Sequence, residues 1–123
     1  MSNYKGVIIK ESLEDKSLLK QIRIISTKVE KVTKKHRSRE KQWTLHTIEI
    51  EEDKADDIAG QISLSIKDKW YADFKNKTHH FIIFKNKVFF IDRTSLEQYN
   101  EAKQYGISLG IPEYQVDFHP EVK

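Results

Sequence analysis

Asp73 and the histidines are the residues of this chain whose types suit acid–base chemistry. Asp73 follows Tyr71 by two residues in an alternating apolar segment, and His46 lies in a second such segment. A carboxylate beside an imidazole can transfer protons as a general acid and base. We therefore take His46, Asp73 and His79 as candidate catalytic residues, with Tyr71 beside them. The histidine that meets Asp73 across the sheet is either His46 or a member of the pair His79 and His80. The alternatives are a buried, hydrogen-bonded His46 and an Asp73 that lies in water at a strand end.

Other reaction classes find little support in the sequence. His79 and His80 are adjacent in a strand-like segment, so they point to opposite faces and cannot jointly bind one metal ion. The absence of cysteine excludes thiolate nucleophiles and cysteine-ligated metals. Four glycines leave little room for a phosphate-binding loop, and no familiar hydrolase motif is present. We predict no metal site and no cofactor, and favour a non-catalytic protein.

A basic run is the second feature with chemical potential. Residues 31–41 contain six Lys or Arg and one acid, a net charge of +5, whereas the whole chain carries +3. A positive loop between two strands could contact phosphate groups, or it could be a solvated loop. The RNA-recognition signature is absent from the segment 85–90. The candidate nucleic-acid-binding residues are Lys34, Lys35, Arg37, Arg39, Lys41 and Trp43.

Alternating apolar residues predict the strands that must position these groups. The expected ranges are 4–9, 21–32, 42–51, 70–74, 79–84, 88–92 and a last strand over 114–118. In the second range the alternation changes phase after Ile24, which predicts a β-bulge. Asn86 tolerates the left-handed backbone of a tight turn, so the fifth and sixth ranges are expected to form a hairpin.

Two helices are expected between these strands. Apolar residues at helical spacing from Ala55 to Ile66 predict the first, with Asp53 as its N-cap. Ser95 and Gln98 form a capping box that opens the second, and Gly106 or Gly110 ends it.

The order of these elements predicts a single α+β domain over residues 1–123. We expect a mostly antiparallel sheet of five to six strands with both helices on one face. From residue 42 the order β-α-β-β-α-β is that of a ferredoxin-like, split βαβ fold, preceded here by an N-terminal β-hairpin. Whether 70–74 and 79–84 are two strands or one bulged strand stays open.

The strands carry more apolar surface than two helices on one face can cover. Segments 81–84 and 88–91 are apolar on both sides, so the helix-free face needs its own cover. We predict a homodimer through that face. Closure of the sheet into a half-barrel and folding-over of the N-terminal hairpin are the alternatives.

Three segments resemble a small single-domain prokaryotic family of uncharacterised function. They are WTLHT at 43–47, WYADF at 70–74 and LGIPEYQVDF at 109–118. The resemblance covers nearly the whole chain, from about Tyr4 to Pro120, and implies a stand-alone cytosolic domain without indicating an activity or a ligand.

The functional expectation combines these observations. Neither a secretory signal nor an apolar run of about 20 residues is visible, which favours a cytoplasmic protein without a membrane span. We expect a binding or assembly module that homodimerises. Nucleic-acid binding through residues 31–41 is one alternative. The other is an enzyme or a small-molecule or metal site near His46, Tyr71, Asp73 and His79.

Overall fold

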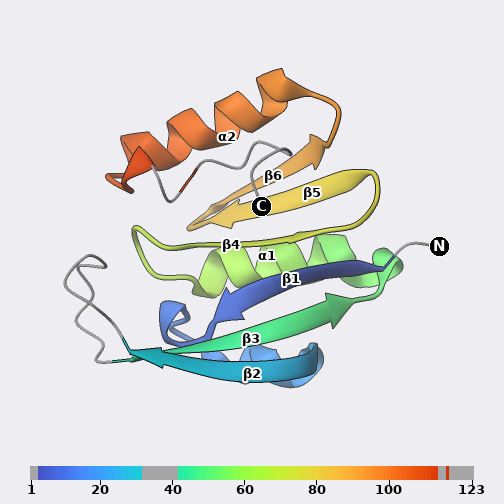
Figure 1. Cartoon of the computed structure of the whole chain (residues 1–123), viewed down its shortest axis with the longest axis vertical. Helices are drawn as coiled ribbons and strands as arrows, with labels where there is room; N and C mark the ends of the chain where they lie inside the picture. Colours follow the sequence, from blue (N-terminus) through green and yellow to red (C-terminus); the bar gives the residue numbers. More distant parts are fainter. Residues whose placement is uncertain (1–2, 32–41, 114–115, 117–123) are drawn as a thin grey trace.

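Six strands form one antiparallel sheet in the computed structural model, which describes residues 3–31, 42–113 and 116. The order across the sheet is β2-β3-β1-β4-β5-β6 (Figure 1). The strands are β1 (Tyr4–Ile9), β2 (Arg23–Lys31), β3 (Gln42–Ile50), β4 (Tyr71–Lys75), β5 (His79–Phe84) and β6 (Lys87–Asp92). The two main helices are α1 (Ala55–Ser65) and α2 (Leu96–Ser108). The α+β class predicted from the sequence is confirmed.

The N-terminal strand β1 lies in the middle of the sheet. It pairs antiparallel with β3 on one side and with β4 on the other. Strands β3 and β4 therefore run parallel to each other, and α1 connects them across β1. This is a split βαβ unit, but the inserted strand is the first of the chain, so the expected ferredoxin-like order is not found.

The predicted N-terminal hairpin is wrong, because β1 and β2 are not neighbours. Between them the chain forms two short 3-10 helices, η1 (Lys10–Ser12) and η2 (Lys16–Gln21). This segment buries Leu13, Leu18 and Leu19 in the same cluster as α1. Because removing these leucines from water is favourable, the chain crosses the face of the sheet instead of making a direct hairpin turn. The chain then returns at the far edge of the sheet, beside β3.

Two local predictions are confirmed. The pairing of β2 with β3 shifts register between Ile24 and Ser26, which is the expected bulge. Strands β4 and β5 are separate and pair antiparallel, and β5 forms a hairpin with β6. Asn86 in its turn has a φ of 60°, the left-handed conformation that the sequence requires there.

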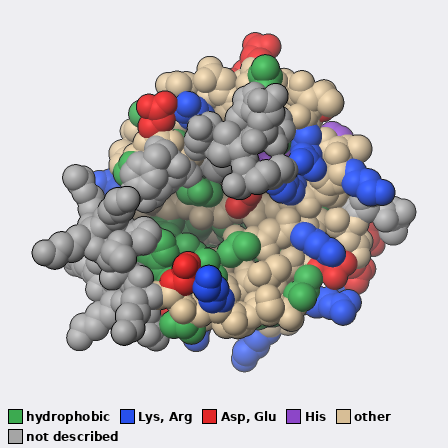
Figure 2. All heavy atoms as spheres, viewed as in Figure 1, with side chains coloured by type: hydrophobic (Ala, Val, Ile, Leu, Met, Phe, Trp, Pro, Cys, Tyr) green, Lys and Arg blue, Asp and Glu red, His purple; other side chains and the backbone are tan. Residues whose placement is uncertain are grey.

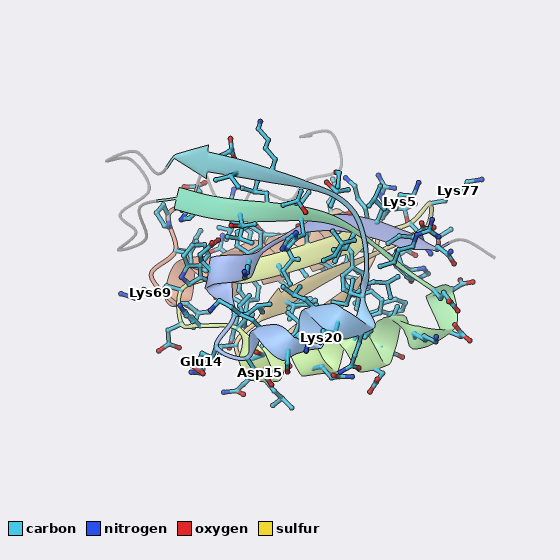
Figure 3. All side chains as sticks on the ribbon, turned by 90° about the horizontal axis from the view of Figure 1, so that it is seen from below. Lys5, Glu14, Asp15, Lys20, Lys69 and Lys77 are labelled. Atoms are coloured by element: carbon cyan, nitrogen blue, oxygen red, sulfur yellow. The ribbon has the colours of Figure 1, made fainter. Side chains whose placement is uncertain are left out.

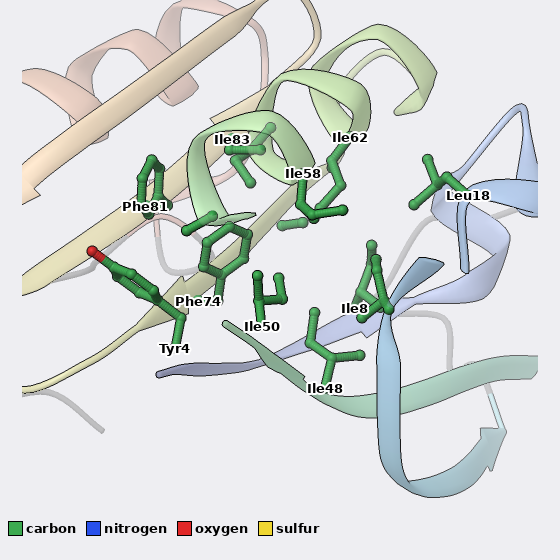
Figure 4. Packing of buried hydrophobic residues seen from close by; sticks show 14 of the residues in the cluster. Tyr4, Ile8, Leu18, Ile48, Ile50, Ile58, Ile62, Phe74, Phe81 and Ile83 are labelled. Atoms are coloured by element: carbon green, nitrogen blue, oxygen red, sulfur yellow. The ribbon is translucent and has the colours of Figure 1, made fainter. Parts of the chain in front are cut away.

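Helix α1 and the segment η2 cover one face of the sheet, as Figure 3 shows from the side. Figure 4 shows the apolar stripe of α1, including Ile58 and Ile62, packed on side chains of the central strands. The helix begins at Ala55 with Lys54 as its N-cap, and Asp53 lies in the preceding 3-10 turn η4 (Glu52–Lys54). The prediction of Asp53 as the cap is therefore wrong, because a 3-10 turn joins β3 to the helix.

Helix α2 covers the opposite face, so the expectation of two helices on one face is also wrong. Ile83 belongs to the cluster of α1, whereas its neighbour Ile82 packs with Tyr99 and Ala102 of α2. Adjacent residues of a strand point to opposite faces, so strand β5 has one helix on each side. The apolar residues on both sides of β5 require this arrangement, since each face needs its own cover.

The end of α2 is partly as predicted. Ser95 is the N-cap, and its hydroxyl accepts a hydrogen bond from the backbone of Gln98. The helix runs past Gly106 to Ser108, and Gly110 follows with a φ of 93°. Of the expected last strand 114–118, only Val116 is among the described residues. It lies in a bend and is buried in the cluster of α2.

Candidate functional site

Asp73 and His80 form a close carboxylate–imidazole pair between neighbouring strands. In the register of β4 and β5, Asp73 lies opposite Ile82, one diagonal step from His80. His80 Nε2 is 2.7 Å from Asp73 Oδ2. The histidine is only 4% exposed, whereas one third of the Asp73 side chain is exposed. The pair therefore extends from the interior beneath α2 to the molecular surface.

Tyr99 and Arg93 extend this pair into a chain of hydrogen bonds. The Tyr99 hydroxyl lies 3.1 Å from His80 Nδ1, and Arg93 hydrogen-bonds that hydroxyl. A carboxylate can only accept, so in the neutral imidazole Nε2–H donates to Asp73 and Nδ1 accepts from Tyr99. Arg93 thus donates to Tyr99, Tyr99 to His80, and His80 to Asp73. Burial raises the pKa of Tyr99, and Arg93 lowers it only in part, so the phenol keeps its proton.

The position of Arg93 is itself fixed. Its guanidinium Nη1 donates to the backbone oxygen of Asn76 at 2.7 Å, in the turn between β4 and β5. The Asn76 side chain in turn accepts from the backbone N–H groups of Thr78 and His79. The hydrogen-bond chain is therefore attached to a turn whose backbone is held by its own side chain, which limits the positions that Asp73 can take.

His46 lies on the other face of the sheet and does not meet Asp73. It is opposite Ile8 of β1 on the α1 side, with Nδ1 2.8 Å from the Thr27 hydroxyl. Burial, followed by the positive charge of Lys10, lowers its pKa, so it is neutral near pH 7. This arrangement matches the alternative of a buried, hydrogen-bonded histidine.

His79 also points away from Asp73. It shares the α1 side with Phe81 and stacks on Phe90, with ring centroids 4.4 Å apart and an interplanar angle of 3°. Its Nδ1 lies 2.9 Å from the Thr78 hydroxyl. Of the two adjacent histidines, the structure therefore joins His80 to Asp73 and places His79 in an aromatic contact at the end of the sheet.

Tyr71 is the candidate residue that lies two positions before Asp73 in the same strand. It is half-buried against Phe84, with ring centroids 6.2 Å apart. Burial, followed by the negative charge of Asp73, raises the pKa of the Tyr71 hydroxyl well above its usual range. Tyr71 is therefore a neutral phenol on the same side of the sheet as the carboxylate.

The middle of the sheet is hollowed on the α2 side. Figure 2 shows this hollow between hydrophobic side chains and an acidic one. By the strand registers, Asp73 lies opposite Val7 on this face, and Val7 lies opposite Thr47. Val7 is 43% exposed although it belongs to a central strand. We call this surface the central hollow and define it by Val7, Ile9, Leu45, Tyr71 and Asp73.

Outside the described residues lie five of the candidate nucleic-acid-binding residues, namely Lys34, Lys35, Arg37, Arg39 and Lys41. Trp43 is described and packs edge to face on Trp70, with centroids 5.3 Å apart. That contact occupies part of the indole surface of Trp43, the sixth candidate nucleic-acid-binding residue.

The geometry of the Asp73 site suits binding more than catalysis. Both ring nitrogens of His80 are hydrogen-bonded within the protein, and the ring is buried, so the imidazole serves to position Asp73. The carboxylate is one third exposed at one end of the hydrogen-bond chain, and Arg93 is partly exposed at the other end. Among the described residues, no group of three or more His, Asp or Glu could hold a metal ion.

The sequence pointed to Asp73 and Tyr71 but missed the partners that define the site. Tyr99 lies among the apolar residues of α2 and Arg93 in the turn before that helix, and neither position by itself indicates a contact with His80. The usable signal was the alternation of His80 with Ile82 and Phe84, which puts this histidine on the same face as Tyr71. No local pattern in the sequence indicates that α2 covers that face.

Comparison with known proteins leaves the fold and the site to be interpreted by themselves. No family model, no curated protein and no solved structure matches this chain. In the described part of the chain, no helix has the length and apolar character needed to cross a bilayer.

Proposed function

We propose that this α+β domain is a non-catalytic binding module that holds a small, partly apolar molecule in the central hollow. Binding sites for small molecules are concave, mostly apolar and equipped with a few fixed polar groups. The central hollow has this composition, since aliphatic side chains surround one carboxylate and one neutral phenol.

One observation carries the proposal. The Asp73 carboxylate is held by a buried histidine and remains one third exposed, directly opposite the exposed Val7. A carboxylate that served only to hold α2 on the sheet could be covered completely. Instead, the network fixes the carboxylate at the surface beside aliphatic groups, where a ligand can contact both the carboxylate and the aliphatic side chains.

Filling the hollow tests this proposal. We expect Val7→Trp to occupy the space beside Asp73 and to abolish binding of ligands found by an NMR fragment screen of the unchanged chain. The matched control is Leu64→Trp, because Leu64 is 75% exposed on α1, on the other side of the sheet. Ligands whose chemical-shift changes persist in Val7→Trp and vanish in Leu64→Trp would contradict the assignment.

Self-association is the second candidate, and the exposure of Val7 favours it. The helix-free face expected from the sequence is reduced to the β1, β2 and β3 part of the α2 side, since α2 covers β5 and β6. We propose a homodimer through this part as an alternative use of the same surface. A concave surface packs poorly on a copy of itself, which is why a small molecule is the first candidate.

Sedimentation velocity at micromolar concentration tests the dimer. The expected result is a species of twice 14.6 kDa that Val7→Lys converts to monomer, because a charged side chain at the interface is left without a partner. Leu64→Lys should leave the dimer intact. A monomer of 14.6 kDa in the unchanged chain would remove this candidate.

Nucleic-acid binding stays a prediction from the sequence. Replacing Lys34, Lys35, Arg37 and Arg39 by alanine should abolish retention on heparin while the thermal unfolding curve is unchanged. The control is the same number of alanines at lysines outside the run, for example Lys20, Lys54, Lys67 and Lys77. Equal retention of the two variants would refute a specific role for residues 31–41.

A further inference from the structure

The arrangement of side chains around Asp73 indicates which chemical class of ligand the central hollow accepts. On the α2 side, β1 presents Lys5, Val7 and Ile9, and the antiparallel β4 presents Lys75, Asp73 and Tyr71. Three rows result, each about 7 Å from the next along the strands. The first row contains Lys5 and Lys75, with Glu49 of β3 opposite Lys5. Val7 and Asp73 form the second row, and Ile9 and Tyr71 the third.

Asp73 is the charged group that β1, β3 and β4 contribute to the second and third rows, since Thr47 and Leu45 of β3 carry no charge. At the edge strand β2 the third row ends in Lys28, which lies opposite Leu45 and is paired with Glu30 at 3.8 Å. Tyr71 keeps its proton because burial and the charge of Asp73 raise its pKa. A ligand placed over the β1, β3 and β4 part of these rows therefore meets one negative charge and aliphatic surface, and an anionic ligand would be repelled by Asp73.

The hydrogen-bond chain leaves Asp73 able to accept. His80 occupies Oδ2 at 2.7 Å, and the exposed third of the side chain offers the remaining acceptor sites of the carboxylate. A charged donor is the best partner for such a group, since it adds the attraction between opposite charges to a hydrogen bond that the ionised acceptor already strengthens.

The lysine row sets the direction of the ligand. Lys5 and Lys75 are opposite each other in the pairing of β1 with β4, next to the row of Asp73. Covering Lys5, Lys75 and the neighbouring Glu49 with the apolar body of a cation bound at Asp73 would remove these charged groups from water, which is unfavourable. The apolar body of the ligand therefore extends the other way, over Val7, Ile9 and Leu45.

Resting on the binding site proposed above, we infer that the ligand is a small organic cation, an alkyl amine of about five carbons. Its ammonium group binds the Asp73 carboxylate, and its apolar body lies on Val7, Ile9 and Leu45. The length follows from the spacing of about 7 Å between the second and third rows.

Three probes of equal length test the inference by NMR titration of the ¹⁵N-labelled chain. They are n-pentylamine, 1-pentanol and pentanoate, which differ in charge and share one apolar body. We expect the amine to shift amides of β1, β3 and β4 and to bind about tenfold more tightly than the alcohol. Pentanoate should cause no shift there.

The variant Asp73→Asn isolates the charge. An asparagine oxygen can still accept from His80 Nε2, so the network is retained while the negative charge is lost. We expect the amine to bind this variant no better than the alcohol does. Asp53→Asn, an exposed acid before α1, should retain the tenfold preference.

The outcomes separate the two proposals. If the alcohol or pentanoate binds in the hollow at least as tightly as the amine, the inference that the ligand is a cation is overturned and the proposed binding site stands. No shift in β1, β3 or β4 with any probe would overturn the ligand class, and failure of the fragment screen as well would overturn the site. If Asp73→Asn does not fold, the comparison of probes on the unchanged chain still decides.

Discussion

Gly6→Ala is expected to destabilise the domain by about 4 kcal/mol or to prevent folding, the largest effect of any single methyl group in the described part of the chain. Gly6 lies in β1, opposite Ile48 of β3 and Phe74 of β4. A Cβ atom at this position would lie 2.1 Å from the backbone oxygen of Asp73 and 2.7 Å from Phe74 Cα. Both are backbone atoms, so no side-chain rotation relieves the contact.

The cost exceeds ordinary overpacking because of where the contact lies. Strand β1 joins the β2–β3 half of the sheet to the β4–β6 half. Moving β4 away would weaken the hydrogen bonds of that junction and displace Asp73 together with its network. Overpacking that side chains can absorb costs about 1–3 kcal/mol, and here the backbone itself must move.

Gly60→Ala is the matched control for this substitution. Gly60 lies within α1, and a Cβ atom there would have no neighbour within 4 Å. Alanine is favoured over glycine inside a helix by about 1 kcal/mol, so this variant should be more stable than the unchanged chain. Urea unfolding measures both changes. A Gly6→Ala chain within 1 kcal/mol of the unchanged one would contradict the close approach of β1 and β4.

Features that depend on local sequence were predictable. The phase change after Ile24, the turn at Asn86 and the cap at Ser95 each follow from the preferences of a few neighbouring residues. The strand ranges followed in the same way, because alternation is a property of one segment at a time. The bounds of β1, β5 and α1 lie within two residues of those expected.

The arrangement of these elements depends on contacts that no single segment specifies. Nothing in the segment 4–9 indicates that β1 inserts between β3 and β4, since this depends on where Leu13 and Leu18 are buried. The expectation of both helices on one face came from the usual packing of a βαβ order. That expectation fails because Ile82 and Phe84 point to the opposite face, where α2 buries them.

The candidate site shows the same limit at the scale of single residues. The sequence paired Asp73 with a histidine across the sheet, and the structure contains such a pair. Which histidine takes part depends on the face, and one residue along a strand reverses the face. His80 therefore meets Asp73, while the predicted candidates His46 and His79 point to the α1 side. Tyr99 joins the pair only because α2 covers that face.

Phe84→Ala is the second substitution with a large expected effect, about 3–5 kcal/mol of unfolding free energy. Phe84 has no exposed surface and lies beneath α2. Its ring contacts those of Tyr105, at a centroid distance of 5.2 Å, and of Tyr71. Alanine would leave a cavity between the sheet and the helix, and the surrounding aromatic side chains can close it only in part.

Phe90→Ala is the control, because it removes the same side chain from the same hairpin at an exposed position. Phe90 is 53% exposed and points to the α1 side, where it stacks on His79. It also contacts Phe81, with ring centroids 4.8 Å apart. At about 0.5–1.5 kcal/mol for each of the two aromatic pairs, its loss should cost less than about 3 kcal/mol. Equal costs for the two variants in urea unfolding would contradict the burial of β5 between two helices. Phe84→Ala should also loosen Tyr71 beside Asp73, so it should weaken binding of the amine probe, whereas Phe90→Ala should leave that affinity unchanged.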